Sequence, residues 1–246
     1  MECTPELLLY LPELVADLEE LGGSSRVILS LLRPLKLPAG SRALDLGCGK
    51  GAVALALAEK MGFRCVGVDA FPPFLETAQK NAAARELSDR CQFRCADLLE
   101  VVEEYKEFDV ALMLALGAAI GSPAEIVGLL RPSVRSGGYM LIDDSFLAPG
   151  VEGPVAGYES YSNHETTVRQ LTSHGDTLLR ERIFSPDDVV REYRMQLEFF
   201  RRRAEKLSQQ HPEAAPLLAS YLERQQREDE LAARTVLNAV WLLQSS

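Results

Sequence analysis

A regular alternation of short apolar runs with amphipathic stretches occupies the centre of this 246-residue chain, from residue 42 to residue 142. Each apolar run is followed by turn residues and then by a helical pattern. Parallel strands need such helices, because each crossover must return the chain to the starting edge of the sheet. The alternation therefore predicts an α/β fold, a doubly wound, Rossmann-like and mostly parallel sheet with helices on both faces.

The same patterns place individual elements. The expected strands of the core are 42–46, 64–68, 92–94, 108–112 and 139–142. The expected helices of the core are 51–61, 72–85 and 122–133. Outside the core we expect an amphipathic helix over 5–21, a second helix to about 35, a loop over 145–162, a helix over 185–210, a further charged helix and a last strand over 236–243.

A chain of this length suits one large domain, and no linker in it separates a second one. We expect a single domain over 1–246 with three parts. Residues 1–36 form an N-terminal helical cap and residues 37–145 form the cofactor-binding core. Residues 146–246 supply a loop on the substrate side, a helical insertion and the final strands.

Charge and cysteine content narrow the class of protein. The formal net charge of −10 disfavours binding to nucleic acid or to an anionic membrane. Five cysteines, an odd number without a C-x-x-C pair, and only three histidines argue against a disulfide framework and against a metal site. The start lacks the basic residues of a secretory signal, and no apolar run approaches the ~20 residues of a membrane span. We expect a reduced, cytoplasmic protein.

The stretch ALDLGCGKGA, residues 43–52, is a glycine-rich turn between the first strand and its helix. Such a turn lets a ligand approach the backbone closely, because no side chains fill the space. It fits two patterns. Gly47, Gly49 and Ala52 match the dinucleotide pattern G-x-G-x-x-A, whereas Gly47, Gly49 and Gly51 match G-x-G-x-G.

Three aspartates that follow successive strands distinguish the two patterns. Asp45 would repel a pyrophosphate but would tolerate a sulfonium or ammonium group. Asp69 is placed to accept hydrogen bonds from ribose hydroxyls, and Asp97 from an adenine amino group. Together they predict a cleft for a cationic adenosyl compound, S-adenosyl-L-methionine.

Several short segments resemble those of class I S-adenosylmethionine-dependent methyltransferases, in the small-molecule group typified by ubiquinone, menaquinone and sterol methylation (methyltransferase type 11). The segments are DLGCGKG at 45–51, VGVD at 66–69, AD at 96–97, FD at 108–109 and GGYMLI at 137–142. The resemblance covers about residues 22–145. It implies a seven-stranded sheet with an antiparallel last strand, a place that 236–243 would fill.

The resemblance also implies which residues surround the cofactor. The three glycines of the turn would border the methionine portion, Asp69 the ribose and Asp97 the adenine. Cys48 is expected to be a small packed residue, and Lys50 a solvated residue at the start of a helix. The expected cofactor-binding residues are Ser24, Asp45, Gly47, Cys48, Gly49, Gly51, Asp69, Ala70, Ala96, Asp97, Leu98 and Leu114.

Methyl transfer requires mainly alignment of the acceptor with the methyl group and exclusion of water. A general base helps where the acceptor is a hydroxyl, an amine or an acidic carbon. Asp143 and His164 are the candidates for a base, with Tyr158 and Tyr161 as walls of the acceptor pocket. Capping, turn or surface roles are the alternatives for these residues.

The loop after the fourth strand is apolar. It lacks the D/N-P-P-Y motif, which resembles that of enzymes that methylate the amino group of adenine or glutamine. We expect a small-molecule acceptor in a closed, dry pocket, capped by the N-terminal helices and the insertion at 185–232. The alternative for the insertion is a homodimer interface.

Two other functions stay open at this point. An NAD(P)-dependent oxidoreductase would use the G-x-G-x-x-A pattern, although no Tyr-x-x-x-Lys pair occurs in the chain. A non-catalytic protein that binds an adenosyl ligand would carry the same turn and acids. The sequence identifies neither the acceptor and its reacting atom nor the oligomeric state.

Overall fold

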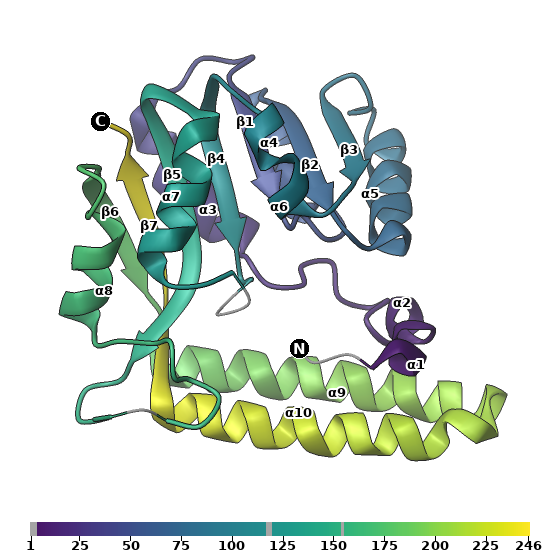
Figure 1. Cartoon of the computed structure of the whole chain (residues 1–246). Coiled ribbons are helices and arrows are strands. Elements are labelled where there is room, and N and C mark those ends of the chain that lie inside the picture. The colour runs from purple at the N-terminus through teal and green to yellow at the C-terminus, as the bar shows by residue number, and fades with distance from the viewer. Residues whose placement is uncertain (1–3, 117–119, 154) are drawn as a thin grey trace.

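The computed structural model describes residues 4–116, 120–153 and 155–246. Cys3 and part of the apolar loop after the fourth strand, 117–119, lie outside the described residues. The strands are β1 Arg42–Leu46, β2 Arg64–Asp69, β3 Cys91–Cys95, β4 Phe108–Leu114, β5 Val134–Leu147, β6 Thr177–Ile183 and β7 Val236–Gln244. They form one seven-stranded sheet in the order β3-β2-β1-β4-β5-β7-β6 (Figure 1).

The sheet has the direction pattern expected from the sequence. β1 pairs in parallel with β2 and β4, β2 with β3, and β4 with β5. β7 runs antiparallel to both of its neighbours, β5 and β6. The prediction of a mostly parallel, seven-stranded sheet with an antiparallel last strand is therefore confirmed.

Helices cover both faces of the sheet. The flanking helices are α3 Ser25–Leu32, α4 Ala52–Met61, α5 Pro72–Ala84, α6 Leu98–Val101, α7 Pro123–Leu130 and α8 His164–Leu171. One apolar core joins α3 and α4 to the sheet, and a second core joins α6, α7 and α8 to its other face. Side chains of a strand alternate between the two cores, with Ala43 in the first and Leu44 in the second.

The N-terminal segment differs from the expected single helix over 5–21. It contains two short helices, α1 Pro5–Leu8 and α2 Leu11–Leu14. Pro12 lies in the first turn of α2 and explains the break, since it has no N–H to continue a helix and its ring clashes with the preceding turn. Residues 15–24 follow without a regular helix.

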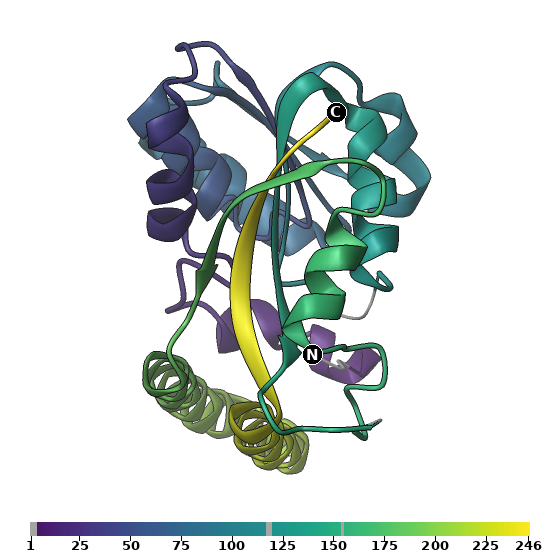
Figure 2. The same cartoon turned by 90° about the vertical axis from the view of Figure 1, so that its left-hand side faces the viewer.

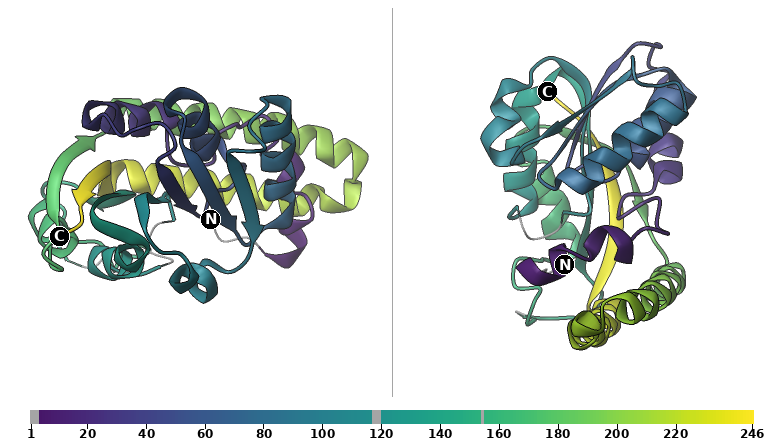
Figure 3. Two further views of the ribbon diagram at one scale, coloured as in Figure 1. Left: turned by 90° about the horizontal axis from the view of Figure 1, so that it is seen from above. Right: turned by 90° about the vertical axis from the view of Figure 1, so that its right-hand side faces the viewer.

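The insertion expected before the last strand is a pair of long helices between β6 and β7, α9 Pro186–Gln210 and α10 Ala215–Thr235. The two helices lie side by side beyond the carboxyl ends of β1 and β4 (Figures 1 and 2). The N-terminal helices pack onto this pair in a third apolar cluster, and they lie between it and the sheet (Figure 3).

Two elements were not expected, and one is longer than expected. β6 has mostly exposed residues in the order TLLRERI, so it lacks the apolar alternation of a half-buried strand. α8 is short and polar, and it begins within a segment that otherwise reads as loop. β5 extends to Leu147, beyond the expected end at residue 142, because β7 pairs with it along this extension. Among the described residues, no helix is long and apolar enough to span a bilayer.

Candidate functional site

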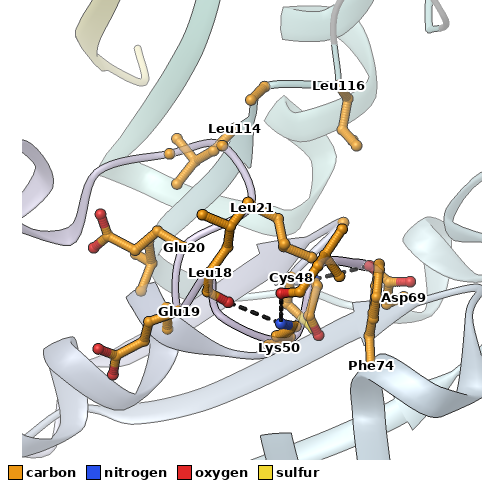
Figure 4. Close-up of a pocket in the computed structure, with 18 of the residues that line it drawn as sticks. Leu18, Glu19, Glu20, Leu21, Cys48, Lys50, Asp69, Phe74, Leu114 and Leu116 are labelled. Atoms are coloured by element: carbon orange, nitrogen blue, oxygen red, sulfur yellow. Dashed lines mark hydrogen bonds between the residues drawn. The ribbon is translucent and has the colours of Figure 1, made fainter. Parts of the chain in front are cut away.

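A cavity of about 320 Å³ lies against the carboxyl ends of β1, β2 and β4. Ligands bind at this edge in open α/β sheets, because the loops that leave the strands converge there. The glycine turn and the end of β4 form one wall, and residues of the N-terminal segment form another (Figure 4). The lining also includes Gln196 and Phe200 of α9, Gln225 of α10 and Phe74 of α5.

The glycine turn has a backbone that only glycine adopts without strain. Gly47, Gly49 and Gly51 have φ angles of +77°, +51° and +75°. A Cβ on Gly47 would lie 2.7 Å from the side chain of Leu116, and one on Gly51 would lie 2.8 Å from Phe93. Gly47 and Gly49 line the cavity, whereas Gly51 packs against the core.

Asp69, at the end of β2, fixes the shape of the turn. Its Oδ2 accepts a hydrogen bond of 2.8 Å from the Gly49 N–H, and its Oδ1 accepts one of 2.9 Å from the Phe71 N–H. Asp69 lines the cavity. A carboxylate oxygen has two lone pairs, so each oxygen can accept a further bond from a ligand hydroxyl.

Asp45, at the end of β1, is buried but lines the same cavity. Burial raises the pKa of its carboxyl to about 7, and the nearby charge of Asp69 also raises it. A bound cation would favour the ionised form. Cys48 is packed, as expected, and burial raises the pKa of its thiol, so it is no ready nucleophile.

Lys50 is not the solvated residue that the sequence suggested. It is buried, and its Nζ donates hydrogen bonds to the carbonyl oxygens of Val15, at 2.5 Å, and Leu18, at 2.8 Å (Figure 4). The correction has a simple cause: the N-terminal segment folds back across the glycine turn. A contact between residues so far apart in the chain leaves no local pattern.

The other residues predicted to bind the cofactor divide into two groups. Leu114 lines the cavity beside Asp45, Gly47, Cys48, Gly49 and Asp69. The remaining ones do not line it: Ser24, Gly51, Ala70, Ala96, Asp97 and Leu98.

Asp97 and Ala96 have local contacts of their own. Asp97 caps α6, with its Oδ1 accepting the Leu99 N–H at 2.9 Å. The Ala96 N–H donates to the Asp69 carbonyl at 3.1 Å, which keeps the end of β3 beside the cavity. For the six residues outside the lining, contact with a cofactor stays a prediction.

The neighbouring carboxylates of Asp143 and Asp144 differ in their hydrogen bonds. Asp143 of β5 is paired in register with Leu114 of β4, which lines the cavity. Its carboxyl makes no hydrogen bond with any residue of the described chain. Burial raises its pKa to about 7, and the neighbouring charge of Asp144 also raises it. Asp144 is engaged instead, accepting the Ser145 N–H at 2.7 Å and the Tyr161 hydroxyl at 2.9 Å.

His164 lies away from the cavity, at the start of α8. Its Nε2 is 2.7 Å from a carboxylate oxygen of Glu181, and its ring packs on Phe146 with centroids 4.9 Å apart. Tyr158 and Tyr161 pack on each other, with ring centroids 5.6 Å apart, and neither lines the cavity. The structure therefore does not bring these three predicted residues to the cavity, and Asp143 does not line it either, although its strand partner Leu114 does.

Sequence reasoning did not identify the individual residues that the cap regions contribute. Leu18, Glu19 and Leu21 come from the N-terminal segment, and Gln196 and Gln225 come from the helical pair. The sequence does hold one signal for the two glutamines: each is a polar residue beside the apolar stripe of its helix. Within the described chain, no group of three or more His, Cys, Asp or Glu side chains is placed to hold a metal ion.

Known proteins with similar sequences include methyltransferases. The chain is 29% identical to 27-O-demethylrifamycin SV methyltransferase of Amycolatopsis mediterranei over 138 residues, which are 56% of this chain and 50% of that protein. It is 31% identical to the chloroplastic tocopherol O-methyltransferase of Arabidopsis thaliana over 101 residues, 41% of this chain and 29% of that protein. The chain thus spans half or less of the length of these relatives.

Solved structures share the fold over nearly the whole chain. The X-ray structure of YjhP from Escherichia coli has a TM-score of 0.81 at 19% identity, covering 96% of this chain and 99% of that one. A methyltransferase from Thiobacillus denitrificans, solved in complex with S-adenosyl-L-homocysteine, has a TM-score of 0.79 at 19% identity and full coverage of both chains.

The family described as a methyltransferase domain matches residues 37–181, which is more than half of the chain and includes the glycine turn, β1 to β5 and most of β6. The order of the strands, the glycine turn and the acids at the strand ends agree with that match. The chain belongs to the methyltransferase domain family.

Proposed function

We propose that the cavity binds S-adenosyl-L-methionine and that the protein transfers its methyl group to a small molecule. The observation that carries the proposal is the convergence of two carboxyl groups, Asp45 and Asp69, on a cavity floored by a bare glycine turn. The family of the chain and the names of its relatives support the same activity.

The residues present fit an adenosyl cofactor. Asp69 has lone pairs left for the two ribose hydroxyls, and Gly47 and Gly49 leave their backbone open to the cavity. Asp45 supplies negative charge at the cavity wall, which suits a sulfonium and an ammonium group but not a pyrophosphate. The NAD(P)-dependent alternative is therefore the less favoured one.

The cofactor, when bound, supplies an activated methyl group with its leaving group already attached to it. The chain has to hold the acceptor in line with that group and keep water out. Leu21, Leu114 and Leu116 give the cavity apolar walls at the carboxyl edge of the sheet. These side chains favour a dry environment for the reacting atoms.

Asp143 is the base that we propose for an acceptor bearing a proton. It is paired with Leu114 on the neighbouring strand β4. Its carboxyl has no hydrogen-bond partner in the described chain, whereas the carboxyl of Asp144 has two. A pKa raised to about 7 suits a group that must take up a proton near neutral pH. His164 stays a second candidate from the sequence, but its contacts with Glu181 and Phe146 favour Asp143.

A small-molecule acceptor agrees with the enclosure of the cavity by the N-terminal segment and the helical pair. Gln196 and Gln225 add amide groups to the lining, although each amide already donates to a carboxylate on its own helix, Glu192 and Asp229 respectively. A cytoplasmic location belongs to the same proposal, and the cysteines of the described chain are free thiols, as a reducing compartment requires. A homodimer stays a prediction.

Calorimetric titration of the purified protein with S-adenosyl-L-homocysteine, S-adenosyl-L-methionine and NAD tests the proposal. We expect both adenosyl ligands to bind and NAD to release no heat. Asp69→Asn should weaken adenosyl binding, while the matched change at an exposed site, Asp89→Asn, should leave it unaltered. Saturation by NAD alone would refute the proposal, and adenosyl binding without turnover over a broad acceptor panel would favour a non-catalytic role.

A further inference from the structure

Lys50 makes an unusual set of contacts for a lysine in a glycine turn. It is only 7% exposed, and its ammonium group donates to two backbone carbonyls, those of Val15 and Leu18. Burial lowers the pKa of Lys50, and in the described chain no carboxylate forms an ion pair with it. A buried ammonium persists only where its donors are satisfied, so this contact is specific to the folded position of the N-terminal segment.

The segment that receives these bonds, residues 15–23, is here called the strap. It crosses from α2 to α3 past the glycine turn and lines the cavity along most of its length (Figures 1 and 4). Its regular backbone bonding is sparse: among the described residues, no backbone–backbone hydrogen bond has a donor in residues 19–23. Side chains hold it instead.

Three side-chain links attach the strap to three different parts of the protein. Lys50 ties it to the glycine turn, Arg203 of α9 donates to Asp17 through Nε and Nη2, and Arg85 pairs with Glu19. The last two links are partly exposed and therefore screened by solvent. Lys50 makes the one buried link among them.

From this arrangement we infer that Lys50 is a positioning residue that holds the strap closed over the adenosyl site and so limits the exchange of the cofactor for its product. The inference rests on the proposed function of that cavity. The backbone of Lys50 is part of the glycine turn, which would border the ligand. Its ammonium group binds the strap, which would cover the ligand. Loss of the ammonium group leaves the turn in place but releases the strap.

Lys50→Met tests the inference, because methionine keeps much of the buried chain length and removes the ammonium group. The matched control is Lys60→Met, since Lys60 is an exposed lysine that pairs with its neighbour Glu59. The probe is tritiated S-adenosyl-L-homocysteine, bound to the protein and then chased with unlabelled ligand. We expect its dissociation rate to rise by about tenfold or more in Lys50→Met, as the loss of charge-assisted hydrogen bonds predicts, and to stay unchanged in Lys60→Met.

Amide hydrogen exchange without ligand gives a second readout that does not depend on binding. The amide of Leu18 in the strap, and that of Ser25, which donates to Glu20 of the strap, should exchange faster in Lys50→Met, while those of β1 and β4 keep their protection. Should Lys50→Met fail to fold, Arg203→Gln breaks the strap's link to α9 and should produce the same two effects more weakly.

The outcomes distinguish a failure of the role inferred for Lys50 from a failure of the proposed function. Unchanged dissociation and unchanged strap exchange in a folded Lys50→Met protein that still binds the probe would overturn the role of Lys50. If the wild-type protein fails to bind the probe at all, the proposed function falls. In that case the exchange of the strap amides in the free proteins still decides whether Lys50 holds the strap.

Discussion

Affinity for S-adenosyl-L-methionine should depend on pH through Asp45. This carboxyl lines the cavity, and burial together with the charge of Asp69 raises its pKa from an ordinary 3.8 to about 7. The titratable groups that interact with it are Asp69 and the thiols of Cys48 and Cys65, whose pKa values are raised. A cationic ligand binds best to the ionised form of Asp45, so binding at lower pH must first remove a proton.

The size of the effect follows from this pKa. At pH 8 about nine in ten Asp45 carboxyls are ionised before the ligand binds, and at pH 6 about one in ten. If the bound cation keeps Asp45 ionised throughout, the dissociation constant should rise about tenfold from pH 8 to pH 6, or about 1.4 kcal/mol. Nearly one proton should leave the protein for each ligand bound at pH 6.

Calorimetric titration at pH 6, 7 and 8, in two buffers that differ in ionisation enthalpy, measures both the affinity and the proton count. Asp45→Asn should abolish most of the pH dependence and bind weakly throughout. Asp143→Asn is the control, because Asp143 has a similar pKa but does not line the cavity. A wild-type affinity that is flat from pH 6 to pH 8, with no proton released, would refute the assignment of Asp45 to the cationic end of the ligand.

Four further variants can be checked. Asp69→Ala should weaken cofactor binding by about 1.5–3 kcal/mol, the value of charge-assisted hydrogen bonds, and an unaltered calorimetric affinity would exclude its ribose role. Gly49→Val should prevent binding, because the residue has a φ of +51° and its Cβ would lie 3.4 Å from the Leu21 side chain; an equilibrium binding assay at wild-type strength would contradict this. Asp143→Asn should lower turnover without loss of cofactor affinity. Burial raises the pKa of Asp143 from 3.8 to about 7, so the stability that this carboxyl contributes is fully present below its ordinary pKa and is lost as pH rises through about 7. Asp143→Asn has no charge to bury and should raise the free energy of unfolding at pH 8 by as much as about 4 kcal/mol, measured by urea denaturation. His164→Ala should leave turnover nearly intact, and a large loss at constant cofactor affinity would make His164 the base.

The core of the fold could be predicted because its signals are local. β1 is a short aliphatic run bounded by turn residues, and its predicted range, 42–46, is the observed one. β6 could not be predicted, because an edge strand with exposed side chains needs no apolar alternation and resembles a polar loop. The break between α1 and α2 had a local signal in Pro12, which the apolar periodicity around it outweighed.

The candidate site also contains residues that could be predicted from the sequence and residues that could not. The glycine turn, Asp45 and Asp69 lie on neighbouring strands whose order follows from the alternation of elements, so their convergence could be expected. Lys50 could not be assigned, because its partners are carbonyls from a segment more than thirty residues earlier. Asp143 and Asp144 look equivalent in the sequence, and only their hydrogen bonds distinguish them.

The long pairing of β5 with β7 has a consequence for how such an enzyme can change. Past the end of β4, residues 144–147 of β5 continue their pairing with β7, and α10 leads directly into that ribbon. The helical pair is thus joined to the sheet through this ribbon, and not through the strands that bear the glycine turn. If the proposed function holds, exchanging the residues of α9 and α10 that line the cavity should alter the choice of acceptor more than the binding of the methyl donor, so related chains can differ in substrate while they share the cofactor.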